Sequence, residues 1–197
     1  QYRTPILIYL RSRGLTDHDA EDIVQDVFIE ICQDTFLQKA DRKKGKFRTL
    51  LLRVTQHILS SEFRKQYSLK RGGGKKAIPL EELLDQAEAA PDDEEFNSLW
   101  AKNIFQLSME RLRLESPKSK IPYHAVLTLR YIEGKGCAEI AKKLDCKLHD
   151  VDNYLYQGKI RLKKYLTDLA RDYCSSEDEY NQEMEFLKSH VPPPPGS

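Results

Sequence analysis

The stretch Thr16-Asp-His-Asp-Ala-Glu-Asp-Ile-Val-Gln-Asp-Val-Phe-Ile-Glu-Ile-Cys32 decides the fold class of this chain. The Thr16 hydroxyl can cap a helix, with Asp19 three residues further on. The apolar residues then recur at helical spacing and form a single stripe along one face: Ala20, Ile23, Val24, Val27, Phe28, Ile31 and Cys32. The stretch therefore predicts an amphipathic helix that begins after Thr16.

The opposite side of this helix is acidic. Four carboxylates fall together on the helical wheel, namely Asp19, Asp22, Asp26 and Glu30. An exposed helix face is ordinarily charged for solubility. Such a face usually contains both acidic and basic residues, which form ion pairs one turn apart. Stacked carboxylates without a base repel one another, so the alternative is that something basic outside the helix compensates them. The acidic face is therefore a candidate docking surface.

The same helical periodicity recurs through the rest of the chain, whereas alternating runs and hairpin dipeptides are few. We expect an all-α protein with two small helical domains joined by a linker, because 197 residues suffice for one large or two small domains. The predicted parts are a first domain at 1–76, an acidic linker at 77–93, a second domain at 94–172, and a helical extension with a proline-rich tail at 173–197.

The net charge of +1 is the sum of opposed blocks. From Thr16 to Asp34 the chain has seven acids and no Lys or Arg, and from Lys39 to Lys76 it has thirteen Lys or Arg against two acids. The overall charge balance therefore says little about binding partners.

A second helix is predicted from Phe47 to Lys70 within the basic block. It mixes Lys and Arg with aromatic rings, the combination that contacts single-stranded nucleic acid, because cations follow phosphates and rings stack on bases. A merely basic surface is the alternative that the residues leave open.

The strongest local pattern lies between Ile140 and Tyr154. A small Ala141 stands where two helices would cross, apolar positions would fix their angle, and Asp145 occupies the turn where Gly is more usual. The pattern predicts a helix-turn-helix whose second helix starts near Leu148, with an ordinary helical hairpin as the alternative.

Several classes of function are not supported. The sequence shows no nucleophile paired with a base, no set of metal-ligand residues and no phosphate-binding loop. We therefore expect a protein that is not an enzyme and that binds neither a cofactor nor a metal ion. The four cysteines contain no CxxC pair, which suits reduced thiols. No apolar run is long enough to span a membrane, and we expect a cytoplasmic protein without membrane insertion.

Four segments together carry a family resemblance: Asp19-Ala-Glu-Asp-Ile-Val-Gln-Asp-Val-Phe28, Gly45-Lys-Phe-Arg-Thr-Leu-Leu-Leu-Arg53, Leu129-Arg-Tyr-Ile-Glu-Gly134 and Glu139-Ile-Ala141. In this order they resemble extracytoplasmic-function sigma factors of bacterial RNA polymerase. The resemblance implies a non-catalytic subunit that binds core polymerase and directs promoter-specific transcription initiation.

The resemblance also implies three sets of contacts. The core polymerase, through the clamp and flap regions of its large subunits, is the expected protein partner, and the clamp is met by Asp19, Glu21, Asp22, Gln25, Asp26 and Glu30. Capture and melting of the -10 promoter element are expected from Phe47, Arg48, Arg53, His57, Ser61, Phe63, Arg64 and Lys65. Binding of the -35 element is expected from His149, Asp150, Asn153, Tyr154, Tyr156, Gln157, Lys159 and Arg161.

The expected -35 helix departs from the family pattern, because its front is acidic. Asp150 and Asp152 stand where Thr, Lys or Arg are common. Acids near phosphates weaken binding, although an Asp can accept a hydrogen bond from a cytosine amino group. We therefore expect -35 recognition that is unusual in sequence or weaker than in relatives.

Two other interpretations remain open. A helix-turn-helix regulator acting without polymerase would leave the acidic helix and the basic block unused, and a helical protein-binding adaptor would leave the basic block unexplained. An anti-sigma factor or a kinase is an open further partner. The segment after Asp172 is either a short capping helix or a regulatory extension that masks a DNA-binding surface.

Overall fold

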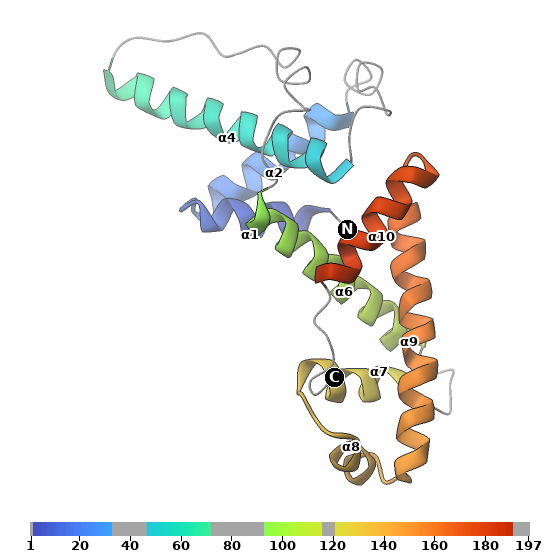
Figure 1. Ribbon diagram of the computed structural model, residues 1–197. Helices are drawn as coiled ribbons and strands as arrows, with labels where there is room; N and C mark the ends of the chain where they lie inside the picture. Colours follow the sequence, from blue (N-terminus) through green and yellow to red (C-terminus); the bar gives the residue numbers. More distant parts are fainter. Residues whose placement is uncertain (1, 33–46, 72–92, 116–120, 191–197) are drawn as a thin grey trace. The chain divides into compact units, whose positions relative to one another are not determined.

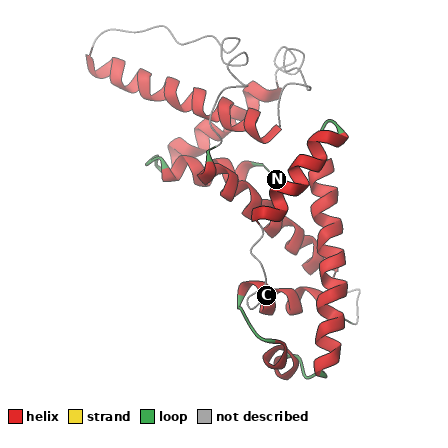
Figure 2. Ribbon diagram, in the orientation of Figure 1, coloured by secondary structure: helices red, strands yellow, loops and turns green. Residues whose placement is uncertain are grey.

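A computed structural model describes residues 2–32, 47–71, 93–115 and 121–190 of the chain (Figure 1). Every regular element in these ranges is a helix (Figure 2), so the predicted all-α class is confirmed. The chain divides into two compact units, Gln1–Trp100 and Ala101–Ser197. The division falls inside helix α6 (Glu94–Glu115), and most of the predicted linker lies outside the described residues. The predicted domain boundaries therefore stay a prediction.

The described part of the first unit contains α1 (Arg3–Ser12), α2 (Asp17–Cys32) and α4 (Phe47–Arg71), together with the start of α6. Helix α2 packs against both α1 and α4, and its predicted apolar stripe is buried. Thr16 caps α2 as expected, because its hydroxyl accepts a hydrogen bond from the Asp19 amide at 3.2 Å. The sequence reasoning did not predict α1.

The chain turns between α1 and α2 at Gly14. Its φ of +87° is a left-handed conformation that glycine adopts without a side-chain clash. The Gly14 amide bonds to the Arg11 carbonyl at 3.0 Å and the Leu15 amide to the Leu10 carbonyl at 3.4 Å, which is the Schellman pattern of helix ends. This turn lets α2 fold back onto α1.

The first turns of α6 complete the core of the first unit. Phe96 and Trp100 are fully buried. Phe96 meets the Tyr9 ring edge-on with centroids 5.5 Å apart, and Trp100 stacks on Tyr2 at 5.6 Å. Burying side chains of this size is the largest apolar contribution available to a small unit.

The second unit contains the rest of α6 together with α7 (Tyr123–Leu127), the π-helical segment η3 (Thr128–Ile132), α8 (Cys137–Lys143) and α9 (Leu148–Arg171). One continuous cluster of buried side chains joins α6, α7, α8 and α9. Gly158 of α9 lies against Leu127, whose Cγ would be 3.2 Å from an added Cβ. The small residue therefore allows α7 to approach α9 closely.

The predicted C-terminal extension contains helix α10 (Glu177–His190), which packs on α9. Met184 and Leu187 are buried, as their spacing predicted. The buried Glu183 carboxylate accepts a 2.9 Å hydrogen bond from the Tyr173 hydroxyl. The extension is therefore a packed helix, and the predicted masking of DNA-binding residues stays a prediction.

Candidate functional site

The acidic face of α2 is exposed. Asp19, Asp22, Gln25 and Asp26 are exposed, whereas Glu21 and Glu30 are half-buried. These residues lie opposite the apolar stripe that packs against the rest of the first unit. The residues predicted to bind the polymerase therefore share one accessible surface, to which we refer below as the acidic face.

Part of this charge is compensated by bases of the same chain. Two arginines of α1 form ion pairs with α2: Arg3 pairs with Glu21, and Arg11 pairs with Asp17 at 2.8 Å. His18 lies 3.1 Å from Asp22, one turn along α2. The bases of α1 thus pair with Glu21 and Asp17, and of the four stacked carboxylates Asp22 has His18 beside it.

The C-terminal part of the acidic face keeps its negative charge. Within the described residues, Asp26 makes no ion pair, and the last turn of α2 contains no basic residue. Glu30 lies near the carbonyl end of the helix, where the helix dipole disfavours a negative charge. This arrangement costs stability, so folding alone does not account for it.

In the first part of α4, the side chains predicted to contact DNA pack within the first unit. Arg48 is 2% exposed and donates a hydrogen bond to the side-chain oxygen of Asn97. Phe47 lies edge-on to Tyr2, with centroids 5.1 Å apart. Arg53 is 6% exposed, and burial lowers the pKa of its guanidinium. The structure thus places Arg48 and Arg53 away from the accessible surface.

The later part of α4 presents the rest of the predicted set. Phe63 and Arg64 are exposed, and His57 and Ser61 are half-buried. Burial lowers the pKa of His57, the nearby charge of Arg64 lowers it further, and the charge of Glu30 opposes this shift. The buried Ser61 hydroxyl oxygen has no hydrogen-bond partner among the described residues. The Lys65 side chain lies outside the described part of the chain.

His57, Ser61 and Arg64 recur at intervals of four and three residues, which places them on one side of α4. The His57 ring and the Arg64 cation together can contact a base and a phosphate, whereas the Ser61 hydroxyl oxygen is buried. We call this set, with Phe63, the exposed end of α4.

Helices α8 and α9 are joined by a short turn at residues 144–147 (Figure 1). Asp145 has a φ of +49°, and the Cys146 amide bonds to the Ala141 carbonyl at 3.0 Å. Asp145 thus occupies the left-handed position that usually requires glycine at a helix end. The predicted tight turn is present, although the residue in it carries a strained backbone.

The residues predicted on α9 divide into two groups. His149, Asn153, Tyr156 and Lys159 are exposed. Arg161 instead lies over the Tyr123 ring at 4.7 Å and pairs with Glu115 at 3.7 Å. Tyr154 packs against the buried cluster, and Asp150 and Gln157 are half-buried. Tyr154 therefore serves the packing of the second unit, while Arg161 is paired within it and keeps a side chain that is 41% exposed.

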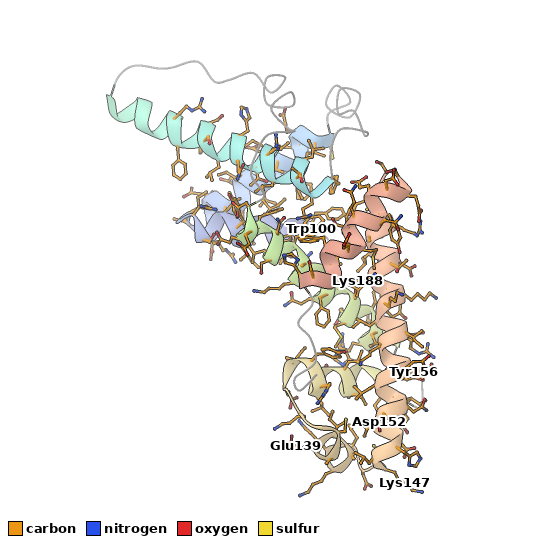
Figure 3. All side chains as sticks on the ribbon, in the orientation of Figure 1. Trp100, Glu139, Lys147, Asp152, Tyr156 and Lys188 are labelled. Atoms are coloured by element: carbon orange, nitrogen blue, oxygen red, sulfur yellow. The ribbon has the colours of Figure 1, made fainter. Side chains whose placement is uncertain are left out.

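Three exposed charged residues of α9 were not assigned to the -35 set from the sequence: Asp152, Lys163 and Lys164. All three lie on the same broad side of α9 as Tyr156. Their helical spacing from Tyr156 was the sequence signal that could have identified them. Figure 3 labels Lys147 just before α9, and Asp152 and Tyr156 along its first half.

The described residues contain no group of three or more His, Cys, Asp or Glu side chains that could hold a metal ion. None of the described helices combines the length and apolarity needed to cross a lipid bilayer. The four cysteines are all free. Burial raises the pKa of the Cys174 thiol to about 12, so this thiol is unreactive at neutral pH.

Comparisons with known proteins agree with the resemblance. The sequence profile of a family described as "ECF sigma factor" matches residues 11–164. The chain is 26% identical over 161 residues to the ECF RNA polymerase sigma factor SigE of Mycolicibacterium smegmatis, covering 81% of this chain and 56% of that relative. It is 28% identical over 167 residues to the RNA polymerase sigma factor YlaC of Bacillus subtilis, covering 85% and 88% respectively. No solved structure matches the chain significantly.

Proposed function

The chain belongs to the ECF sigma factor family, and from this premise we propose that it is a sigma factor that binds core RNA polymerase and directs it to promoters. It acts without catalysis of its own, through binding energy alone. Three surfaces of the chain have the chemistry that such a protein needs.

The acidic face of α2 binds the clamp region of the largest polymerase subunit. The observation that carries this assignment is the exposed carboxylate of Asp26, which has no basic partner within the described residues. A basic partner would relieve the repulsion between the stacked carboxylates and offset the unfavourable helix dipole. Charge complementarity of this kind also speeds association.

The exposed end of α4 captures the opened -10 element. Phe63 offers a ring for stacking on an unstacked base, and Arg64 offers a cation for a phosphate. A flipped base costs a few kcal/mol to extrude, which these contacts offset. Phe47 packs against Tyr2, Arg48 bonds to Asn97 and Arg53 is buried, so these three residues are not part of this surface.

Helices α8 and α9 bind the -35 element as a helix-turn-helix. The tight turn at Asp145 supports this assignment, since it sets α9 at an angle to α8 with the front of α9 exposed. The exposed residues His149, Asn153 and Tyr156 face outward there and are available to base edges or backbone. Flap contacts of this unit stay a prediction.

Core binding is the decisive test. The purified chain is mixed with core polymerase, and co-elution and start-site-specific transcription from a promoter library are measured. The double variant Asp22→Lys with Asp26→Lys should lose co-elution while retaining the affinity of the isolated chain for DNA. The matched control, Asp178→Lys with Glu185→Lys, makes the same charge change on exposed positions of α10 and should still co-elute. Absence of core binding by the unmodified chain refutes the proposal.

A further inference from the structure

The two carboxylates at the front of α9 have different surroundings. Asp150 caps the helix: its Oδ2 accepts a hydrogen bond from the Lys147 amide at 3.1 Å, and its Oδ1 lies 3.0 Å from Nε2 of His149. Asp152 is exposed and makes no hydrogen bond or ion pair within the described residues. Asp150 therefore serves the start of the helix, and Asp152 is the carboxylate available to a partner.

Exposed lysines lie on both sides of Asp152 along the chain. Lys142 and Lys147 precede it, and Lys159 and Lys163 follow it on α9. Lysines at these positions can approach phosphates while the carboxylate between them faces the groove floor. Tyr156, 62% exposed, lies one turn beyond Asp152 on the same face (Figure 3). The acid thus has exposed lysines before and after it along the chain, and their contacts with phosphates would offset part of the cost of bringing it to DNA.

We propose that Asp152 specifies a cytosine in the -35 element, its carboxylate accepting a hydrogen bond from the exocyclic amino group of that base in the major groove. The inference rests on the proposed function of α9. Guanine and thymine present only hydrogen-bond acceptors there, which repel a carboxylate. Adenine presents its amino group beside the acceptor N7, whereas the cytosine amino group has no acceptor beside it on the same base. Cytosine is therefore the base that an unpaired carboxylate selects.

The test uses holoenzyme assembled from core polymerase and the full chain, with a promoter library that is randomised at -35 and constant at -10. Bound sequences from the unmodified chain should favour cytosine at one position by roughly tenfold. Asp152→Ala should remove the preference at that position only. Asp152→Asn, nearly identical in shape, should move it towards adenine, because an amide can pair with N6 and N7 of that base.

Lys163→Ala provides the control for a phosphate contact, since it should weaken binding to all library members alike. An unchanged set of preferences in Asp152→Ala, in holoenzyme that still binds core and initiates transcription, overturns the inference and leaves the proposed function intact. Failure of the unmodified chain to bind core in the same preparation overturns both. A purely structural role for Asp152, through the helix dipole, would lower the thermal stability of Asp152→Ala without altering any base preference.

Discussion

The phenolic hydroxyl of Tyr9 donates a 2.8 Å hydrogen bond to the carboxylate of Asp93, the residue that precedes α6. The same carboxylate oxygen lies 2.9 Å from the guanidinium of Arg13, and the other accepts a hydrogen bond from the Phe96 amide at 3.2 Å. Asp93 therefore caps α6 and ties its start to α1 within the first unit.

Asp93→Ala should lower the free energy of unfolding by about 1–3 kcal/mol, because it removes a helix cap and leaves the half-buried Tyr9 hydroxyl with one partner fewer. Glu95→Ala is the matched control: Glu95 is exposed and lies 3.4 Å from Arg13, so its removal should change stability by about 0.5 kcal/mol or less. Urea denaturation of the full chain measures both. If both variants lost the same free energy of unfolding, the helix cap at Asp93 would not stabilise the chain beyond an ordinary surface ion pair.

Stability should fall in alkaline solution through Tyr165. Burial and the 2.5 Å hydrogen bond to Glu115 raise the pKa of this tyrosine to about 12 in the folded chain, against about 10 when unfolded. The folded state therefore holds the proton more tightly, and the stabilisation is complete below pH 10 and lost as the pH rises towards 12.

Tyr165→Phe removes this titration. Its urea midpoint should therefore decline less between pH 9 and pH 11.5 than that of the unmodified chain, even though the variant is less stable at neutral pH. Parallel pH profiles for the two proteins would contradict the assignment.

Substitutions at the two residues with left-handed backbone, Asp145 and Gly14, should change the stability of the chain in opposite directions. Asp145→Gly should stabilise the chain by about 0.5–1 kcal/mol, because glycine adopts a positive φ without the clash that a side chain brings. Gly14→Ala should destabilise it by about 1 kcal/mol for the same reason. No atom lies within 4 Å of the added Cβ at Gly14, so the loss there reports the backbone alone. Thermal unfolding of both variants checks the signs.

The long helices were predictable because their signals are local. Thr16 caps α2, apolar spacing defines the buried side of α4, and the acids at 94 and 95 mark the first turn of α6. Helix α1 escaped prediction because it is short, has Pro5 in its first turn and starts without a side-chain cap. Its stability comes from packing against α2, which a local pattern does not show.

The candidate surfaces were predictable in charge and position but less so in detail. Arg48 and Arg161 read as surface cations, since arginine is rarely buried. Their partners Asn97 and Glu115 lie far along the chain, and only the fold brings them together. Likewise Asp150 and Asp152 are equivalent in the sequence, and the hydrogen bond to the Lys147 amide distinguishes them.

Two adjacent residues of α4 should respond differently to salt. Arg64→Ala should weaken holoenzyme binding to a promoter with a pre-opened -10 region and reduce the slope of log K against log salt by about 0.7, the value for one phosphate contact on a single strand. Phe63→Ala should weaken binding by about 1–3 kcal/mol at every salt concentration, because stacking releases no counterions. Arg113→Ala is the control: this exposed cation of α6 is paired with Glu110 at 2.7 Å and should change neither quantity. If Arg64→Ala left the slope unchanged, the exposed end of α4 would not follow the phosphate backbone, and the -10 assignment would fail at this residue.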